Sequence, residues 1–290
     1  MLRFRSICAF AIAVLATTGY GQASDSASTK RLKRFVVLST LGYGATMTGL
    51  GQIWYSDLDK QSFRFFNDSR EWYQVDKLGH SFASYHLTGF VRGELARGGV
   101  SPNRATHIAA FSSFLAVSSI EIFDGYSSGY GASASDLAAN AFGALLFWSQ
   151  QRVWQEQRIR LKFSFHRTDY PAQRPSLLGK NILEEVIKDY NGQTYWLSMD
   201  IDKFVVFPKW LNLTIGYGAE EFLYASVASN TSEGLSPHRQ YYLGLDFDLT
   251  DIHTRSKFVK TLLNGLSAIR LPAPALAYGQ GKWTFHPLYF

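Results

Sequence analysis

The sequence predicts an α+β protein: an N-terminal helical bundle followed by a smaller region with antiparallel strands. Between residues 76 and 157 the chain holds three apolar segments, each with an uncharged stretch of about fifteen residues, which suits buried bundle helices. After about residue 160 the pattern changes to two-residue alternation, which is typical of strands. Whether the bundle is embedded in a membrane or packed as a soluble core stays open at this point.

The first residues have the layout of a secretory signal. Arg3 and Arg5 precede an apolar run over residues 7–16, and Gly21-Gln22-Ala23 offers small residues for a signal peptidase. The run is too short to cross a bilayer, although an uncleaved anchor is the alternative. We expect residues 1–23 to be a signal peptide, and the protein to be exported and membrane-associated in the periplasm, at the inner or the outer membrane.

The single cysteine, Cys8, lies inside this predicted signal. We therefore expect a mature chain without a thiol. Such a chain has no disulfides, no thiolate metal site, no cysteine nucleophile and no lipid on an N-terminal cysteine.

The formal charge of +6 falls to +4 when Arg3 and Arg5 are removed with the signal. Much of the remaining excess lies in residues 24–34, predicted as a flexible basic lead-in that contains Lys30, Arg31, Lys33 and Arg34. Four basic residues beside an apolar segment suit contact with anionic head groups, and a solvated tail is the alternative. We expect a membrane lipid or envelope component as partner, and no nucleic acid; the oligomeric state is not predicted.

Residues 35–160 are predicted as the helical core. Residues 35–56 carry no formal charge, but four glycines and several hydroxyl residues make them a weak membrane span, so a packed helix competes. Further helices are expected over residues 76–96, 103–123 and 134–157. Gly98-Gly99 ends the first, Pro102 opens the second and Ser133 is the expected N-cap of the third.

Residues 161–290 are predicted as a mixed strand and helix region. TYWLSMDID at residues 194–202 and QYYLGLDFD at 240–248 align as a near-repeat, with apolar residues at every second position. Period two predicts strands whose apolar face is buried. Residues 210–217 and 282–290 are further strand candidates, and residues 255–268 an amphipathic helix. The alternating segments are too few for a full membrane barrel.

The candidate site is a set of polar residues within the apolar helices. Lys77 and His80 share one helix face, Glu121 and Asp124 repeat that spacing, and Asp136, Asn140 and Gly143 share a third face. Burying a carboxylate is costly unless a partner compensates it, so three helices presenting such groups inward predict a common interior cluster.

Three roles for this cluster stay open. It could be a neutralised network that locks the helices, a ligand or divalent-metal site, or a catalytic site with His80 as general base. The candidate catalytic residues, which are also the candidate metal ligands, are His80, Glu121, Asp124 and Asp136. The candidate ligand-binding residues are Lys77, Ser133 and Asn140. No dense ligand motif identifies a metal. Asn67-Asp68 and Glu71-Trp72 are interpreted as a loop cap and a surface contact.

Three segments, FFNDSREWYQVDKLGH, SSIEIFDGYSSGYGASASDLAANAFG and TYWLSMDID, resemble a bacterial family of predicted periplasmic lipoproteins, the YfiM-like family. The likeness covers the chain from about residue 50 onward. The order of DKxxH, an acid and DxxxN over residues 75–145 is similar to VanZ-like membrane proteins. The second likeness implies a helical core, and neither implies a settled activity. We expect an envelope protein with a structural or ligand-binding role at the membrane. The alternative is an envelope hydrolase acting on a lipid or glycan.

Overall fold

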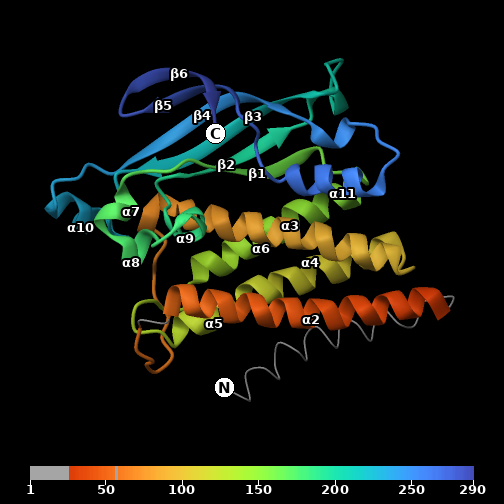
Figure 1. Ribbon diagram of the computed structural model, residues 1–290, viewed down its shortest axis with the longest axis horizontal. Coiled ribbons are helices and arrows are strands. Elements are labelled where there is room, and N and C mark those ends of the chain that lie inside the picture. The colour runs from red at the N-terminus through yellow and green to blue at the C-terminus, as the bar shows by residue number, and fades with distance from the viewer. Residues whose placement is uncertain (1–25, 56–57) are drawn as a thin grey trace. The chain divides into compact units, whose positions relative to one another are not determined.

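The computed structural model describes residues 26–55 and 58–290, so the predicted signal peptide and Cys8 lie outside the described residues. The chain divides into two compact units. Unit 1 holds residues 26–68 and Ala83–Glu156, and unit 2 holds Ser69–Phe82 and Gln157–Phe290. The predicted combination of N-terminal helices with a following antiparallel sheet is confirmed, although the sheet region is not a minor one (Figure 1).

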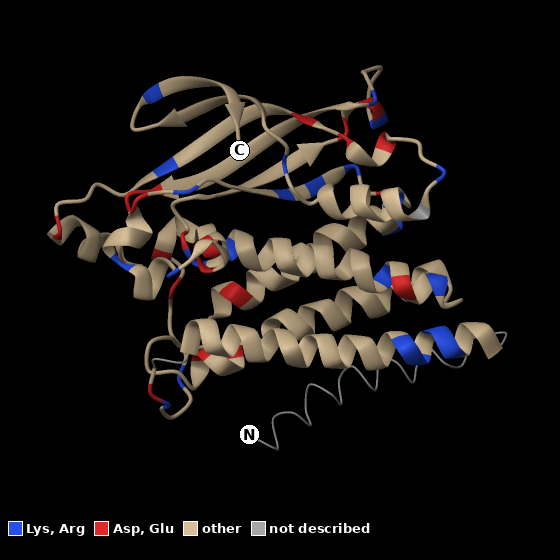
Figure 2. Ribbon diagram, in the orientation of Figure 1, with Lys and Arg blue, Asp and Glu red and all other residues tan. Residues whose placement is uncertain are grey.

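Unit 1 is built from helices. They are α2 (Ser26–Tyr55), most of α3 (Val75–Arg97), α4 (Pro102–Ser118), α5 (Ile120–Gly125) and α6 (Ala134–Val153). Residues 26–34, expected as a flexible lead-in, form the first turns of α2, because the basic run continues directly into a segment without a helix breaker. Figure 2 shows these basic residues as blue ribbon near the N-terminal end of α2, which otherwise lacks charge.

The helix ends follow from local sequence. Gly99 has a φ of 84°, a left-handed conformation that glycine adopts without strain, and it ends α3. Pro102 opens α4, where a missing N–H costs nothing. Ser133 caps α6 by accepting a hydrogen bond from the Asp136 N–H. The single helix expected over residues 103–123 is divided at Ser119 into α4 and α5.

A small apolar core holds α2 against the turn between α3 and α4. Leu32, Leu95, Val100 and Ala105 form it. Along α2, by contrast, Val37, Leu38 and Leu41 are exposed. Among the described residues, the segment Pro102–Gly125 is long and apolar enough to cross a membrane, a property that core helices of soluble proteins share.

Unit 2 contains one antiparallel sheet whose six strands lie in chain order, β1 to β6. The strands are β1 (Ile159–Phe165), β2 (Gln193–Met199), β3 (Leu211–Glu220), β4 (His238–Phe247), β5 (Ala273–Gly279) and β6 (Lys282–Tyr289). The helices are α7 (Tyr170–Gln173), α8 (Pro175–Leu178), α9 (Ile182–Lys188), α10 (Val227–Ser232) and α11 (Lys257–Leu266). Short 3-10 turns are η1 (Glu71–Gln74), η2 (Ile201–Lys203) and η3 (Leu249–Asp251). The near-repeat forms β2 and β4, which flank β3.

The main core of unit 2 includes residues from well before the sheet. Trp72 and Val75 pack with Leu178, Tyr195 and Phe222. Trp72, interpreted from sequence as a surface contact, is therefore a core residue. Its ring lies 5.0 Å from that of Tyr190. The segment Ser69–Phe82 thus belongs to unit 2, although most of α3 belongs to unit 1.

The sheet has one polar face, which is filled by its own side chains. Lys162 Nζ lies 2.5 Å from Asp246 Oδ2, and both side chains are almost fully buried. The Arg270 guanidinium lies 4.0 Å from the centre of the Trp196 ring. It donates to the carbonyl of Tyr289. The prediction that the apolar positions of both repeat strands are buried is wrong for β4, because Tyr241 and Leu243 are exposed. The period of a strand shows that its faces differ, but not which of them is covered.

Candidate functional site

Glu121 on α5 is a deeply buried acid of unit 1. Its side chain is 3% exposed. Oε2 accepts a hydrogen bond from the Ser133 backbone N–H at 2.8 Å. Oε1 is buried and has no hydrogen-bond partner in the described part of the chain. An oxygen in this state is costly in a folded protein unless something further binds it or a proton neutralises it.

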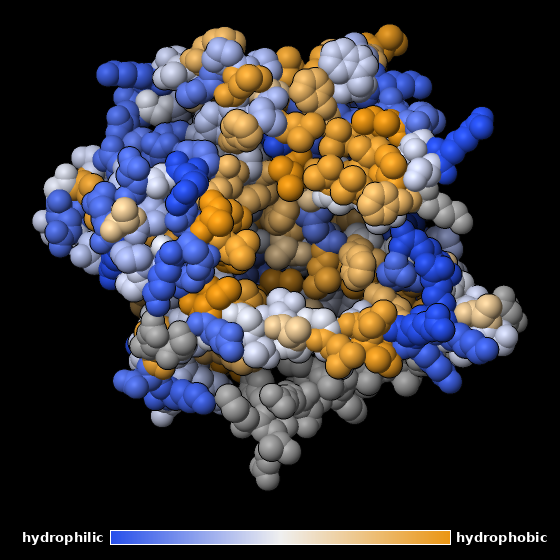
Figure 3. Space-filling model, in the orientation of Figure 1, coloured by the Kyte–Doolittle hydropathy of each residue, from blue (hydrophilic) through white to orange (hydrophobic). Residues whose placement is uncertain are grey.

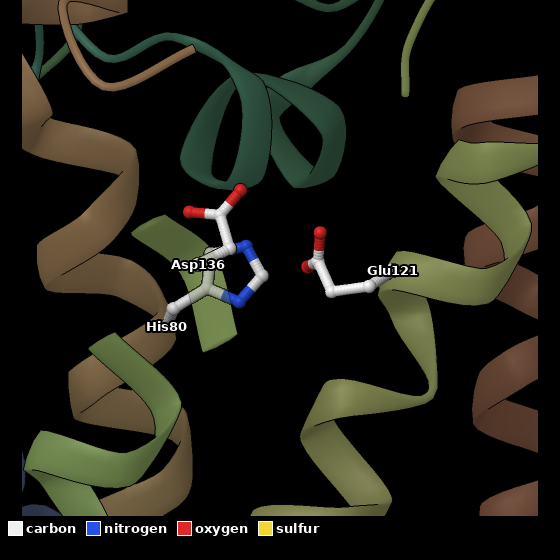
Figure 4. Close-up of side chains that lie close together, drawn as sticks. All are labelled: His80, Glu121 and Asp136. Carbon is white, nitrogen blue, oxygen red and sulfur yellow. The ribbon is translucent and has the colours of Figure 1, made fainter. Parts of the chain in front are cut away.

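Two more acids of unit 1 lie close by. Asp136, in the first turn of α6, has a carboxylate oxygen within 4.8 Å of one from Glu121 and of one from Asp68. Figure 4 shows the Glu121 carboxylate extending from its helix toward Asp136. Asp68 accepts hydrogen bonds from the hydroxyls of Ser133, at 2.5 Å, and Ser135, at 2.7 Å. We call Asp68, Glu121 and Asp136 the carboxylate cluster.

The local field opposes ionisation of Glu121. Burial raises the pKa of Glu121 from 4.5 to about 8, and the negative charge of Asp136 adds to this. The hydrogen bond from Ser133 lowers the pKa, whereas Asp124 and Asp68 raise it further. The neighbouring charges of Asp136, Asp124 and Asp68 are thus all negative. Proton binding or a cation relieves such a cluster.

Asp124, the fourth predicted acid, faces α2. Its Oδ1 accepts a hydrogen bond from the Tyr55 hydroxyl at 2.6 Å. Burial, followed by the charge of Asp124 and this hydrogen bond, raises the pKa of Tyr55 above its ordinary value. The pair links the end of α2 to α5, and Asp124 acts on the carboxylate cluster through its charge.

The other predicted residues have different surroundings. Lys77 and His80 lie in the first turns of α3, in the part that belongs to unit 2, and Lys77 Nζ is 2.8 Å from Asp76 Oδ2. The Asn140 amide donates to the Ser118 hydroxyl, which joins α6 to α4. Ser133 contacts the cluster with both its amide and its hydroxyl. Unit 1 thus brings together Glu121, Asp136 and Ser133.

Asp68 is the member that sequence reasoning missed. It follows no periodic pattern, because it stands in the loop between α2 and η1. The available signal was indirect. Ser133 and Ser135 stand on either side of a predicted helix start, and their hydroxyls needed an acceptor.

Residues 64–148, which contain the whole carboxylate cluster, match the family described as "Predicted periplasmic lipoprotein (DUF2279)". Over this segment the chain is similar to cell-envelope proteins, and the description agrees with an exported, periplasmic and membrane-associated location. The segment covers less than a third of the chain and includes none of the sheet. No curated protein and no solved structure matches the chain.

Proposed function

We propose that this envelope protein binds a divalent cation through the carboxylate cluster. The observation that carries the proposal is the Oε1 atom of Glu121, which is buried without a hydrogen-bond partner in the described part of the chain, beside two further acids. Carboxylate oxygens are the ligands that calcium, magnesium and manganese ions prefer.

The charge balance favours a cation over a purely structural network. A structural network of buried acids is stable when basic groups compensate it. The charges that act on Glu121 come from Asp136, Asp124 and Asp68, which are all negative. A bound cation would remove the repulsion, occupy Oε1 and allow Glu121 to ionise at neutral pH.

We further propose His80 as a nitrogen ligand, as the sequence pattern suggests. A histidine added to carboxylates would shift the preference from calcium toward manganese, iron or zinc. The identity of the bound ion therefore tests the participation of His80.

The experiment is thermal unfolding of the chelator-treated protein with added magnesium, calcium, manganese or zinc. A site that binds one of these ions raises the melting temperature as the ion concentration rises. At a hundred times the dissociation constant the stabilisation is about 2.7 kcal/mol. Glu121→Gln should lose the shift, since the substitution keeps the shape of the side chain but removes its charge.

Glu94→Gln is the matched control, because Glu94 makes an exposed ion pair with Arg97 on the same helix as His80. It should keep the full metal-dependent shift. The proposal fails if all four ions leave the melting temperature unchanged, or if Glu121→Gln responds as the unmodified protein does. His80→Ala should weaken the response to zinc and manganese more than the response to calcium.

A second candidate function is hydrolysis of an envelope lipid or glycan, with His80 as general base. One observation favours it: the matched segment 64–148 contains His80 together with the three acids of the cluster. We propose a relation to YfiM-like and VanZ-like proteins. This relation does not identify the reaction. In this case His80→Ala should abolish function while the protein accumulates and melts normally. A loss of both function and melting temperature would favour a structural network instead.

A further inference from the structure

The sheet of unit 2 carries apolar side chains on its outer face, the face opposite the Lys162–Asp246 pair. The strand register aligns these residues in two rows across β3 to β6. One row is Tyr217, Tyr241, Tyr278 and Trp283. The next row is Ile215, Leu243, Leu276 and Phe285.

Apart from Tyr217, which is half-buried and donates a hydrogen bond to the Tyr73 carbonyl, these two rows are largely open to solvent. Leu243 is 55% exposed, and Trp283 and Phe285 are each 64% exposed. Leu288, further along β6, is 68% exposed. Figure 3 shows apolar residues at the surface of the molecule. Apolar residues scattered singly over a surface are normal in soluble proteins. Two complete rows on four neighbouring strands form a contiguous patch, and such patches mark a surface that something else covers.

The same face is covered where it continues onto β1 and β2. There Phe163 and Tyr195 pack against Phe82, with ring centres 5.9 and 6.0 Å from it. Gly79 brings the helix backbone close, since a Cβ at this position would lie 2.9 Å from the Tyr195 hydroxyl. The outer face is therefore apolar across the sheet, and its β1–β2 half is covered by the segment Ser69–Phe82 of unit 2 itself.

The inner face has the opposite character. Trp196 and Tyr242 lie there with the Lys162–Asp246 pair and with polar side chains that are fully or almost fully buried. The buried polar residues include Ser198, Asn212, Thr214 and Arg270. The inner face thus combines buried polar side chains with an aromatic cluster, and the outer face is apolar. This order is the reverse of that in a soluble sheet and the same as in sheets that face lipid.

The outer face is also graded along the strands. Beyond Tyr241 the outer face carries Arg239, which pairs with Ala219 and stacks on the Tyr73 ring with its guanidinium 3.9 Å from the ring centre. The row of tyrosines and Trp283, followed by the row of Ile215, Leu243, Leu276 and Phe285, matches the order found from head groups to hydrocarbon. From Tyr217 to Leu211 the strand spans about 20 Å at about 3.3 Å per residue, which is shorter than the apolar band of about 25 Å in sheets that cross a membrane.

We propose that the outer face of β3–β6 lies against the hydrocarbon of a phospholipid bilayer, with the Tyr241–Trp283 row at the head-group level. Tyrosine and tryptophan are the side chains that gather at the head-group level of a membrane, with aliphatic residues and phenylalanine next to them toward the hydrocarbon. The proposal is independent of the carboxylate cluster, which belongs to unit 1. It gives the membrane association a defined surface.

The experiment uses the full chain, diluted from detergent into vesicles of phosphatidylethanolamine and phosphatidylglycerol with brominated acyl chains, which quench tryptophan fluorescence at short range. We expect quenching in the unmodified protein, and a clear loss of the quenched signal in Trp283→Phe. The double variant Leu243→Lys with Phe285→Lys should keep its melting temperature in detergent, because both positions are exposed. It should abolish quenching of Trp283 and weaken vesicle binding by at least about tenfold.

Leu183→Lys is the matched control, because Leu183 on α9 is 75% exposed but lies outside the two rows. It should bind vesicles and be quenched as the unmodified protein is. Equal quenching in Trp283→Phe and in the unmodified protein would overturn the proposal. So would retention of Trp283 quenching in the double lysine variant. A lipid-free dimer that the double variant abolishes, measured by light scattering, would assign the face to a second copy of the chain instead.

Discussion

Both units bury charged side chains, but the two sets of charges are balanced differently. In unit 2, Lys162 and Asp246 neutralise each other, and Ser198 donates a further hydrogen bond to Asp246 at 2.7 Å. In unit 1, Glu121 and Asp136 lie together without a comparable ion pair for Glu121. Each set contains a carboxylate oxygen without a hydrogen bond in the described residues, namely Asp246 Oδ1 and Glu121 Oε1.

The comparison shows that burial alone does not identify a site. Unsatisfied oxygens occur in both units, whereas the ion pair that neutralises Asp246 has no counterpart at Glu121 among the described residues. A compensated pair holds a fold together, and an uncompensated group is ready to take up a proton or a cation. The predictions below test this distinction, beginning with the largest expected effect.

Breaking the ion pair of unit 2 should have the largest effect. Lys162→Met leaves the Asp246 carboxylate buried without its cation, and we expect a loss of about 3–5 kcal/mol in the free energy of unfolding. Denaturant unfolding measures the loss. The double variant Lys162→Met with Asp246→Leu should recover much of it, because neither charge of the pair is then left buried without the other. Failure of the double variant to recover stability would show that the pair has a role beyond charge balance.

The carboxylate cluster should make stability depend on pH in the opposite sense from an ordinary ion-paired acid. The pKa of Glu121 is raised from 4.5 to about 8 on folding. The folded state therefore holds a proton that the unfolded state has released between these values. The stabilisation that this proton gives the folded state is complete below pH 4.5. It is lost as the pH rises to about 8, and the free energy of unfolding falls by at most about 1.4 kcal/mol per pH unit.

Glu121→Gln should flatten this part of the stability profile. The measurement is denaturant unfolding from pH 5 to 8, with a chelator present so that no cation replaces the proton. Glu94→Gln should leave the slope unchanged. A slope that is identical in the unmodified protein and in Glu121→Gln would show that Glu121 ionises normally in the folded state.

The smallest effect on stability is expected at the helix caps. One capping serine in each unit, Ser133 in unit 1 and Ser226 in unit 2, allows a direct comparison. Ser133→Ala removes the cap of α6 and a hydrogen bond to Asp68, and should cost about 1–2 kcal/mol. Ser226→Ala removes the cap of the short α10 and a local hydrogen bond with the Ser229 hydroxyl, and should cost about 0.5–1 kcal/mol. Thermal unfolding of both variants checks the order, and equal losses would mean that the contact of Ser133 with Asp68 contributes little.

The helices of unit 1 could be predicted well because their ends carry strong local signals. Gly98-Gly99, Pro102 and Ser133 stand at the ends of α3, α4 and α6 as expected. The proximity of Glu121 and Asp136 also followed from the helix periodicity. Asp68 could not be found in this way, because a loop has no period. The prediction that His80 joins these acids stays a prediction.

The strands were predicted less completely. β2, β3, β4 and β6 followed from their alternation, but β1 and β5 were not anticipated. β5 has alanines at its inward positions and a proline, so its contrast between faces is weak. In β1 the alternation is clear, but Arg160 and Lys162 occupy the inward positions, where charges are not expected. The sequence could not show that the polar face is the filled one.

The discontinuous course of the chain has a practical consequence. Trp72 and Val75 belong to the core of the sheet unit, yet more than seventy residues separate them from β1. A truncated fragment that begins just before β1 would expose the hollow that these two side chains fill, and would aggregate. Production of the sheet alone therefore requires splicing Ser69–Phe82 to its N-terminus through an engineered linker.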